Sequence, residues 1–112
     1  MKTFRDYISE AEQLINEYNA YNASRNAFYD ENVQITEVGT AKFYVAISKW
    51  SKMLDEEKKI VRKAIKAVKN CYRLFGIELP KKIDEYNMDD HLRKFKWMAD
   101  DIDNKIRQYY RF

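Results

Sequence analysis

Apolar residues recur every three or four positions over the first part of the chain, which is the spacing of one face of a helix. Five of them share that face: Phe4, Ile8, Ala11, Ile15 and Tyr18. Thr3, followed by Asp6 three residues later, supplies a capping pattern for the start of a helix. We predict a helix from about Phe4 to Asp30.

The apolar stripe stops before the predicted end of this helix. Asn22, Arg25 and Asn26 occupy the positions where the next core side chains belong. The last two turns therefore either extend past the bundle into solvent or hold a polar contact. We expect the solvated end and keep the polar contact as the alternative.

Residues 32–40 have a different pattern, in which Val33, Ile35 and Val38 are separated by polar residues and Gly39 follows. This pattern predicts an extended connector. A lone strand cannot satisfy its own backbone hydrogen bonds. The segment is therefore either a loop or pairs with another strand, such as its own copy in a dimer.

Two further helices are predicted between Thr40 and Gly76. Thr40 caps a short helix of about 14 residues, with one apolar face made of Phe43, Ile47, Trp50 and Leu54. Asp55 begins the next helix, because Glu56 and Glu57 would then lie in its first turn, where the helix dipole favours negative charge. Gly76 is expected to end this helix as a left-handed cap.

A connector, residues 77–80, precedes the last part of the chain, where 81–86 is expected to form a short helical turn. Asn87 or Asp89 can cap a fourth helix that runs to about Tyr110. Its apolar stripe consists of Leu92, Phe95, Ala99, Ile102, Ile106 and Tyr109.

The expected fold is all-α: a small antiparallel bundle of about four helices, with the 32–40 connector between the first two. With two glycines and one proline, the chain lacks the turn residues that a sheet needs at every reversal. A length of 112 residues suits one domain, 1–112. The tyrosine-rich stripes and the strand-like connector also make a homodimer plausible.

Charge is distributed unevenly along the chain. Residues 1–57 hold 6 basic and 10 acidic side chains, a net charge of −4, whereas residues 58–112 hold 15 and 8, a net charge of +7. On a helical wheel of residues 58–75, the basic side chains fall within about 140° and no acidic side chain joins them. We call this set the basic face: Lys58, Lys59, Arg62, Lys63, Lys66, Lys69 and Arg73.

Like charges one turn apart destabilise a helix. An anion bound against the basic face would offset this repulsion and so explain why the cationic side chains cluster there. Nucleic acid is our first candidate, since its phosphates form a regular array of negative charge. An acidic protein, an anionic membrane, or neutralisation by Glu10, Glu12 and Glu17 of the same chain are the alternatives. Lysine outnumbers arginine five to two on this face, which favours phosphate contact over the reading of base edges.

Trp97 points away from the apolar stripe of the fourth helix, among polar residues that include Arg93 and Asp101. Tryptophan and arginine often anchor protein interfaces, and an indole can stack on an unpaired base. We therefore predict a partner-binding cluster of Arg93, Trp97 and Asp101. The alternative is that the 77–86 connector or the 32–40 segment covers Trp97.

The residues that enzymes need are scarce in this chain. It has one histidine, His91, and no glycine-rich phosphate loop. Asp100, Asp101 and Asp103 are expected on different faces of their helix, and Cys71 falls on an apolar face, where a thiol has a raised pKa. We predict no catalytic residues, no metal site and no cofactor.

No apolar run approaches the roughly 18 residues of a membrane span, and a single cysteine fits a reducing compartment. We expect a cytoplasmic protein, in the host cytoplasm if viral, because the abundance of Lys, Asn, Ile and Tyr suggests a low-GC bacterium or phage. The leading hypothesis is a non-enzymatic protein that docks its basic face on nucleic acid. The alternative is a phage or mobile-element protein that inhibits or redirects a host protein.

Overall fold

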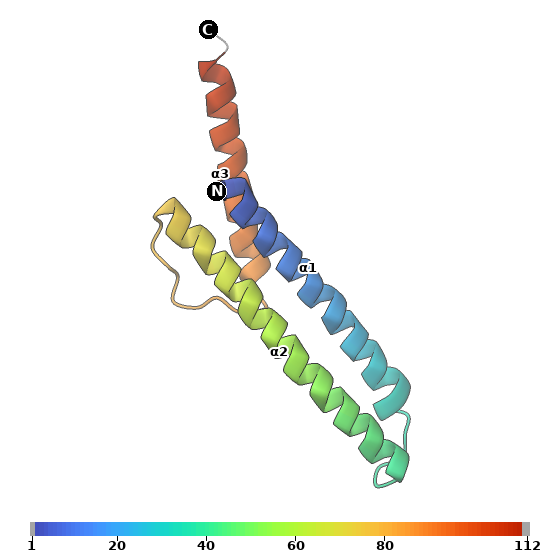
Figure 1. Cartoon of the computed structure of the whole chain (residues 1–112). Helices are drawn as coiled ribbons and strands as arrows, with labels where there is room; N and C mark the ends of the chain where they lie inside the picture. The colour runs from blue at the N-terminus through green and yellow to red at the C-terminus, as the bar shows by residue number, and fades with distance from the viewer. Residues whose placement is uncertain (1, 111–112) are drawn as a thin grey trace.

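The computed structural model describes residues 2–110, and over these residues the chain is helical without β-strands. Helix α1 spans Phe4–Phe28 and continues into a π-helical turn, η1, at Tyr29–Val33. Helices α2 and α3 span Ala41–Phe75 and Met88–Tyr109. Figure 1 shows α1 and α2 as a long antiparallel hairpin, with α3 packed against one end of it. The molecule is elongated, with extents of 73 × 26 × 24 Å.

The predicted start of the first helix is confirmed. The hydroxyl of Thr3 accepts a hydrogen bond from the backbone N–H of Asp6, and the carboxylate of Asp6 accepts one from the N–H of Thr3. Two N–H groups that the helix leaves without partners are thereby satisfied.

The predicted number of helices is wrong, because the second and third predicted helices form the single 35-residue helix α2. Thr40 caps this helix, as expected, by accepting a hydrogen bond from the N–H of Phe43 at 3.2 Å. Gly76 ends it in the left-handed conformation, with φ of 65°, also as expected. Nothing interrupts the helix at Asp55, since residues 41–75 contain neither glycine nor proline.

The predicted solvated end of α1 is also wrong, and the alternative, a polar contact, is what the structure contains. Arg25 forms an ion pair with Glu57 of α2, and the amide of Asn22 donates to the same carboxylate at 3.1 Å. Beyond this cluster, the rings of Tyr29 and Trp50 lie 5.5 Å apart. The two helices therefore remain in contact along the whole hairpin.

The segment predicted as extended, 32–40, instead forms the end of η1 and a series of turns. The N–H of Thr36 bonds the carbonyl of Val33, and the N–H of Thr40 bonds that of Glu37. Of the three apolar residues, Val33 is buried, and Ile35 and Val38 are exposed. Because the segment forms turns, it offers no strand that could pair with its copy in a dimer.

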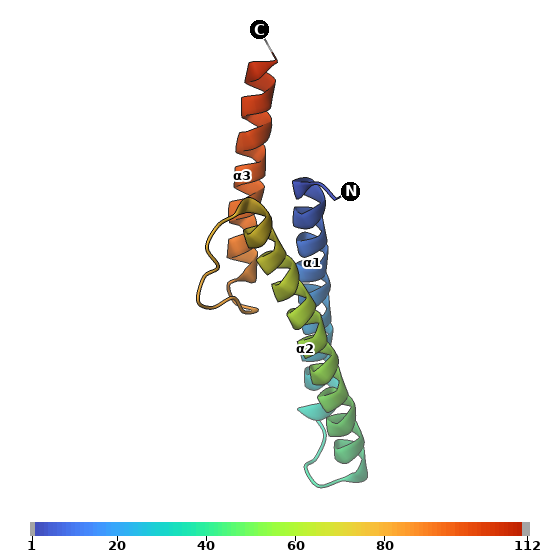
Figure 2. The same cartoon turned by 60° about the vertical axis from the view of Figure 1, so that its left-hand side comes forward.

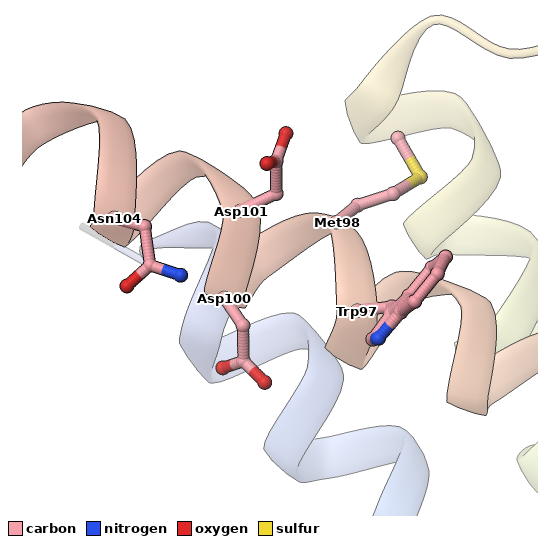
Figure 3. A pocket seen from close by; sticks show the side chains of 5 residues that line it. All are labelled: Trp97, Met98, Asp100, Asp101 and Asn104. Carbon is pink, nitrogen blue, oxygen red and sulfur yellow. The ribbon is translucent and has the colours of Figure 1, made fainter.

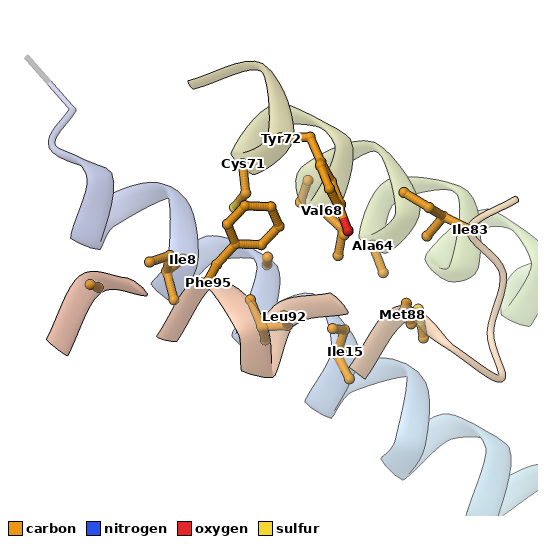
Figure 4. Packing of buried hydrophobic residues seen from close by; sticks show 13 residues of the cluster. Ile8, Ile15, Ala64, Val68, Cys71, Tyr72, Ile83, Met88, Leu92 and Phe95 are labelled. Carbon is orange, nitrogen blue, oxygen red and sulfur yellow. The ribbon is translucent and has the colours of Figure 1, made fainter. Parts of the chain in front are cut away.

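The core lies at the end of the hairpin where all three helices meet (Figure 4). Phe95 of α3 is fully buried, and its ring lies 4.6 Å from that of Tyr72 and 5.4 Å from that of Phe75. Around it pack Ile8, Ala11 and Ile15 of α1, Ala64, Val68 and Cys71 of α2, and Met88, Leu92 and Ala99 of α3. This packing turns one side of α2 toward the core and leaves the opposite side facing solvent.

The connector between α2 and α3 forms turns rather than the predicted short helix at 81–86. Ile83 anchors it in the core. Partial burial favours the neutral carboxyl of Asp84, but the N–H donors of Tyr86 and Asn87 and the ammonium of Lys82 outweigh it and lower the pKa of Asp84. Asn87, one of the two residues predicted to cap the last helix, occupies the N-cap position of α3, but its side chain bonds the backbone of Lys82 and Asp84 instead of the first turn of the helix.

Among residues 2–110, none of the helices combines the length and the apolar character that crossing a membrane requires.

Candidate nucleic-acid interface

The basic face lies on the side of α2 opposite its core residues, and at one edge, at Lys58 and Arg62, it borders α1. Six of its seven side chains belong to exposed residues, and only Lys69 is partly buried. The opposite side of the same turns supplies Ala64, Val68 and Cys71 to the core. Core packing therefore fixes the orientation in which the basic face meets solvent.

Neutralisation within the chain is slight. Lys59 pairs with Glu56 one turn earlier, at 3.1 Å, with both side chains more than half exposed. Arg73 donates to the neutral side chain of Asn70. Within residues 2–110, none of the other five side chains of the basic face lies within ion-pair distance of a carboxylate.

Two of the three carboxylates of α1 considered as alternative internal partners of the basic face are engaged elsewhere. Glu10 pairs with Lys2 at 2.8 Å, and Glu12 pairs with Lys96 of α3 at 2.6 Å. The alternative in which these two glutamates neutralise the basic face is therefore wrong.

The sequence analysis missed two lysines that the continuity of α2 brings close to the basic face. At 100° per residue, Lys52 falls within the arc of the basic face, as does the exposed Asp55, and Lys49 lies about 40° outside the arc. Both lysines are exposed. From Lys52 to Arg73 the cationic side chains extend over about 32 Å of helix, and Asp55 interrupts the row after Lys52. A helical wheel extended toward the N-terminus, to residues before Asp55, would have included both lysines.

One end of the basic face borders a groove of mixed charge between α1, α2 and the connector. Lys58 and Arg62 line this groove, whose volume is about 740 Å³, together with Glu57 and Glu85. Glu57 is already paired with Arg25 of the same groove, so Glu85 is the lining carboxylate that remains to offset the two cations. The uniformly cationic part of the surface is consequently the row of Lys63, Lys66, Lys69 and Arg73.

Trp97 is exposed, with 82% of its surface accessible, so neither connector covers it. It borders a shallow depression of about 600 Å³ with Met98, Asp100, Asp101 and Asn104. Figure 3 shows Asp100 and Asp101 pointing in different directions from α3. Both aspartates have cationic partners, since Asp100 pairs with Arg5 and Asp101 with Lys105, each at 3.1 Å.

Two of the three residues predicted as a partner-binding cluster line this depression. Trp97 and Asp101 line the same depression, whereas Arg93 does not contribute to its wall. Arg93 instead pairs with Asp89 at 3.2 Å and with Asp90 at 3.7 Å in the first turns of α3.

The prediction that Asp100, Asp101 and Asp103 lie on different faces is wrong for two of them. Asp100 and Asp103 are three residues apart, so they share a face, and both bind Arg5 of α1. The hydrogen bonds that Arg5 donates to Asp103 and Asp100 raise the pKa of its guanidinium. These carboxylates therefore fasten α3 to the start of α1.

The two side chains considered for chemistry have partners or burial that account for them. The hydroxyl of Tyr72 and Nδ1 of His91 lie 2.6 Å apart in a hydrogen bond. Burial raises the pKa of the Cys71 thiol to about 11, which keeps it protonated at neutral pH. Within residues 2–110, no three His, Cys, Asp or Glu side chains gather as metal ligands would.

No protein-family model matches the sequence, and comparisons with curated proteins and with solved structures found no significant similarity.

Proposed function

We propose that this protein is a small non-enzymatic accessory protein that binds nucleic acid through the basic face of α2, largely regardless of base sequence. One observation carries the proposal: seven cationic side chains line one outward helix face, and one of them has a carboxylate partner. Each phosphate contact by such a face releases condensed counterions, which drives association without reading bases.

Two features favour nucleic acid over an acidic protein. The cations follow one another along one face of a single long helix, and a duplex offers repeated phosphates to such a face. Lysines, which act as point charges, dominate the row, whereas arginines are preferred where planar carboxylates or guanine edges are bound in two-pronged fashion.

The test is a salt titration with a fluorescently labelled duplex, followed by anisotropy. Five to seven phosphate contacts predict a slope of log K against log salt of roughly −4 to −6. Undetectable binding at about 50 mM salt, where such contacts are strong, would end the proposal.

A second candidate function rests on the 82% exposure of Trp97 beside Asp101. Exposed tryptophans often anchor protein interfaces, so this surface would suit a phage or mobile-element protein that occupies a surface of a host protein. Trp97→Ala separates the two candidates in the anisotropy assay. Binding through the basic face predicts an unchanged affinity for DNA, whereas a loss would move the contact to α3.

A further inference from the structure

The groove between α1, α2 and the connector places an exposed aromatic ring beside cations of the basic face. Tyr86 of the connector lines this groove together with Lys58 and Arg62, and 85% of the surface of Tyr86 is accessible. Figures 1 and 2 show the connector returning from the end of α2 along the side of this helix before α3 begins. A residue far from the basic face in sequence thereby becomes its neighbour.

The turn that carries Tyr86 is held by hydrogen bonds that do not involve the aromatic ring. The carboxylate of Asp84 accepts hydrogen bonds from the N–H groups of Tyr86 and Asn87, at 2.9 and 3.1 Å. Ile83 anchors the same segment in the core. The fold therefore fixes the backbone at Tyr86 while leaving most of its side chain accessible to a ligand.

The lining of the groove suits a neutral, planar and polar group better than it suits a phosphate. Glu57 is neutralised by Arg25, but Glu85 would repel an anion that entered the groove. The volume of about 740 Å³ is in the range of sites that hold small ligands. Three uncharged side chains of α1 that can form hydrogen bonds also line the groove: Tyr18, Asn19 and Asn22.

The groove is continuous with the uniformly cationic row of α2. Arg62 belongs to the groove and to the basic face, and it precedes Lys66 of the row by one helical turn, about 6 Å along the helix axis. A nucleic acid strand whose phosphates follow the row therefore has its next phosphates at Arg62 and Lys58. The base attached there lies at the groove that Tyr86 lines.

We propose that this groove holds one unpaired base of a nucleic acid strand, stacked on Tyr86, while the phosphates of the strand contact the basic face. The inference rests on the proposed nucleic-acid binding and specifies its class as nucleic acid with unpaired bases. A base in a duplex must first leave its stack and its pair, which costs free energy that a single strand does not require. Stacking is tolerant of sequence, since every base has a π-face.

Trp97 is a less suitable stacking platform for a strand bound along α2, although it is equally exposed. The residues that line the depression at Trp97 all belong to α3. Tyr86 instead shares its groove with two cations of the basic face. Stacking on Tyr86 thus leaves the phosphates of the same strand beside cationic side chains.

The test measures binding of a labelled single strand of mixed sequence, and of a blunt duplex of the same length, by anisotropy at one salt concentration. Tyr86→Ala should weaken binding of the single strand about five- to tenfold, the lower end of the loss for one stacked base. It should leave duplex binding and helicity unchanged, because the side chain is exposed. Tyr86→Phe, which keeps the ring, should bind both like the unmodified chain.

The matched control is Tyr44→Ala, which removes another exposed tyrosine beside two lysines, Lys49 and Lys52, near the start of α2. It should leave both affinities unchanged. Failure of the unmodified chain to bind either nucleic acid would end the proposed function and this inference together. If both bind, three results would overturn the inference alone: a loss in Tyr86→Ala no greater for the single strand than for the duplex, an equal loss in Tyr44→Ala, or an equal loss in Tyr86→Phe.

Discussion

Arg25 and Glu57 show how a single pair of side chains changes the extent of a helical hairpin. On the sequence alone, Arg25 lies where a core residue belongs and Glu57 lies in an apparent first turn. In the structure the two carry the least exposed ion pair of the described residues, with side-chain exposures of 16% and 11%. The pair keeps α1 and α2 together where the apolar stripe of α1 has ended.

Removing one partner should therefore be costly. Glu57→Ala leaves the guanidinium of Arg25 and the amide of Asn22 without their acceptor in a partly buried site. We expect the free energy of unfolding to fall by about 1–3 kcal/mol, measured by urea denaturation. Replacing both charges, in R25L/E57L, should recover most of this loss, because well-packed apolar side chains can substitute for a buried pair.

The control for this cycle is Glu56→Ala, whose carboxylate pairs with Lys59 in an exposed position. It should change stability by less than about 0.5 kcal/mol. If Glu57→Ala and Glu56→Ala lowered the free energy of unfolding equally, the Arg25–Glu57 pair would stabilise the fold no more than an exposed ion pair does.

At the scale of elements, helix starts and stops were predictable where local chemistry sets them. Thr3 and Thr40 cap helices through their own hydroxyl groups, and Gly76 adopts a conformation that other residues avoid. The helix start predicted at Asp55 was wrong because of a contact with another helix. Three consecutive acids imitate the first turn of a helix, but one of them, Glu57, faces a cation of α1.

Proline substitution distinguishes one continuous helix from two. If a helix began at Asp55, Glu56→Pro would fall at its first position, where proline is tolerated. In the continuous α2 the same change removes a backbone hydrogen bond from the helix interior. We expect a loss of about 3 kcal/mol or more, seen as a lower midpoint in thermal unfolding.

Ala41→Pro is the matched control, because Ala41 is the first residue of α2 and Thr40 before it is extended, as a residue before proline should be. This variant should retain its stability. Tolerance of proline at both positions would contradict the continuity of α2.

At the scale of the molecule, the helical class followed from the scarcity of glycine and proline and from periodic apolar stripes. The number of helices and the course of the chain between them did not, since both depend on pairings between residues far apart in sequence. The basic face was predictable residue by residue, because a helix places such residues together whatever lies around it. Its exposure was not, since that depends on how α1 and α3 cover α2.

For the candidate site, the exposure of Trp97 was likewise beyond the sequence, which left covering by either connector open. Arg93 does not line the depression at Trp97 because its side chain is held by other residues. Asp89 and Asp90 lie one turn before Arg93 and bind it locally. Ion pairs between residues one turn apart can hold a side chain away from a cluster that a helical wheel predicts.

The most direct test of the central claim is the salt dependence of DNA binding in two variants of equal net charge. K63Q/K66Q removes two cations from the basic face, and K81Q/K94Q removes two exposed cations from the connector and α3. Contact through the basic face predicts a slope about two units shallower for K63Q/K66Q and an unchanged slope for K81Q/K94Q. Equal slopes in the two variants would contradict binding through α2.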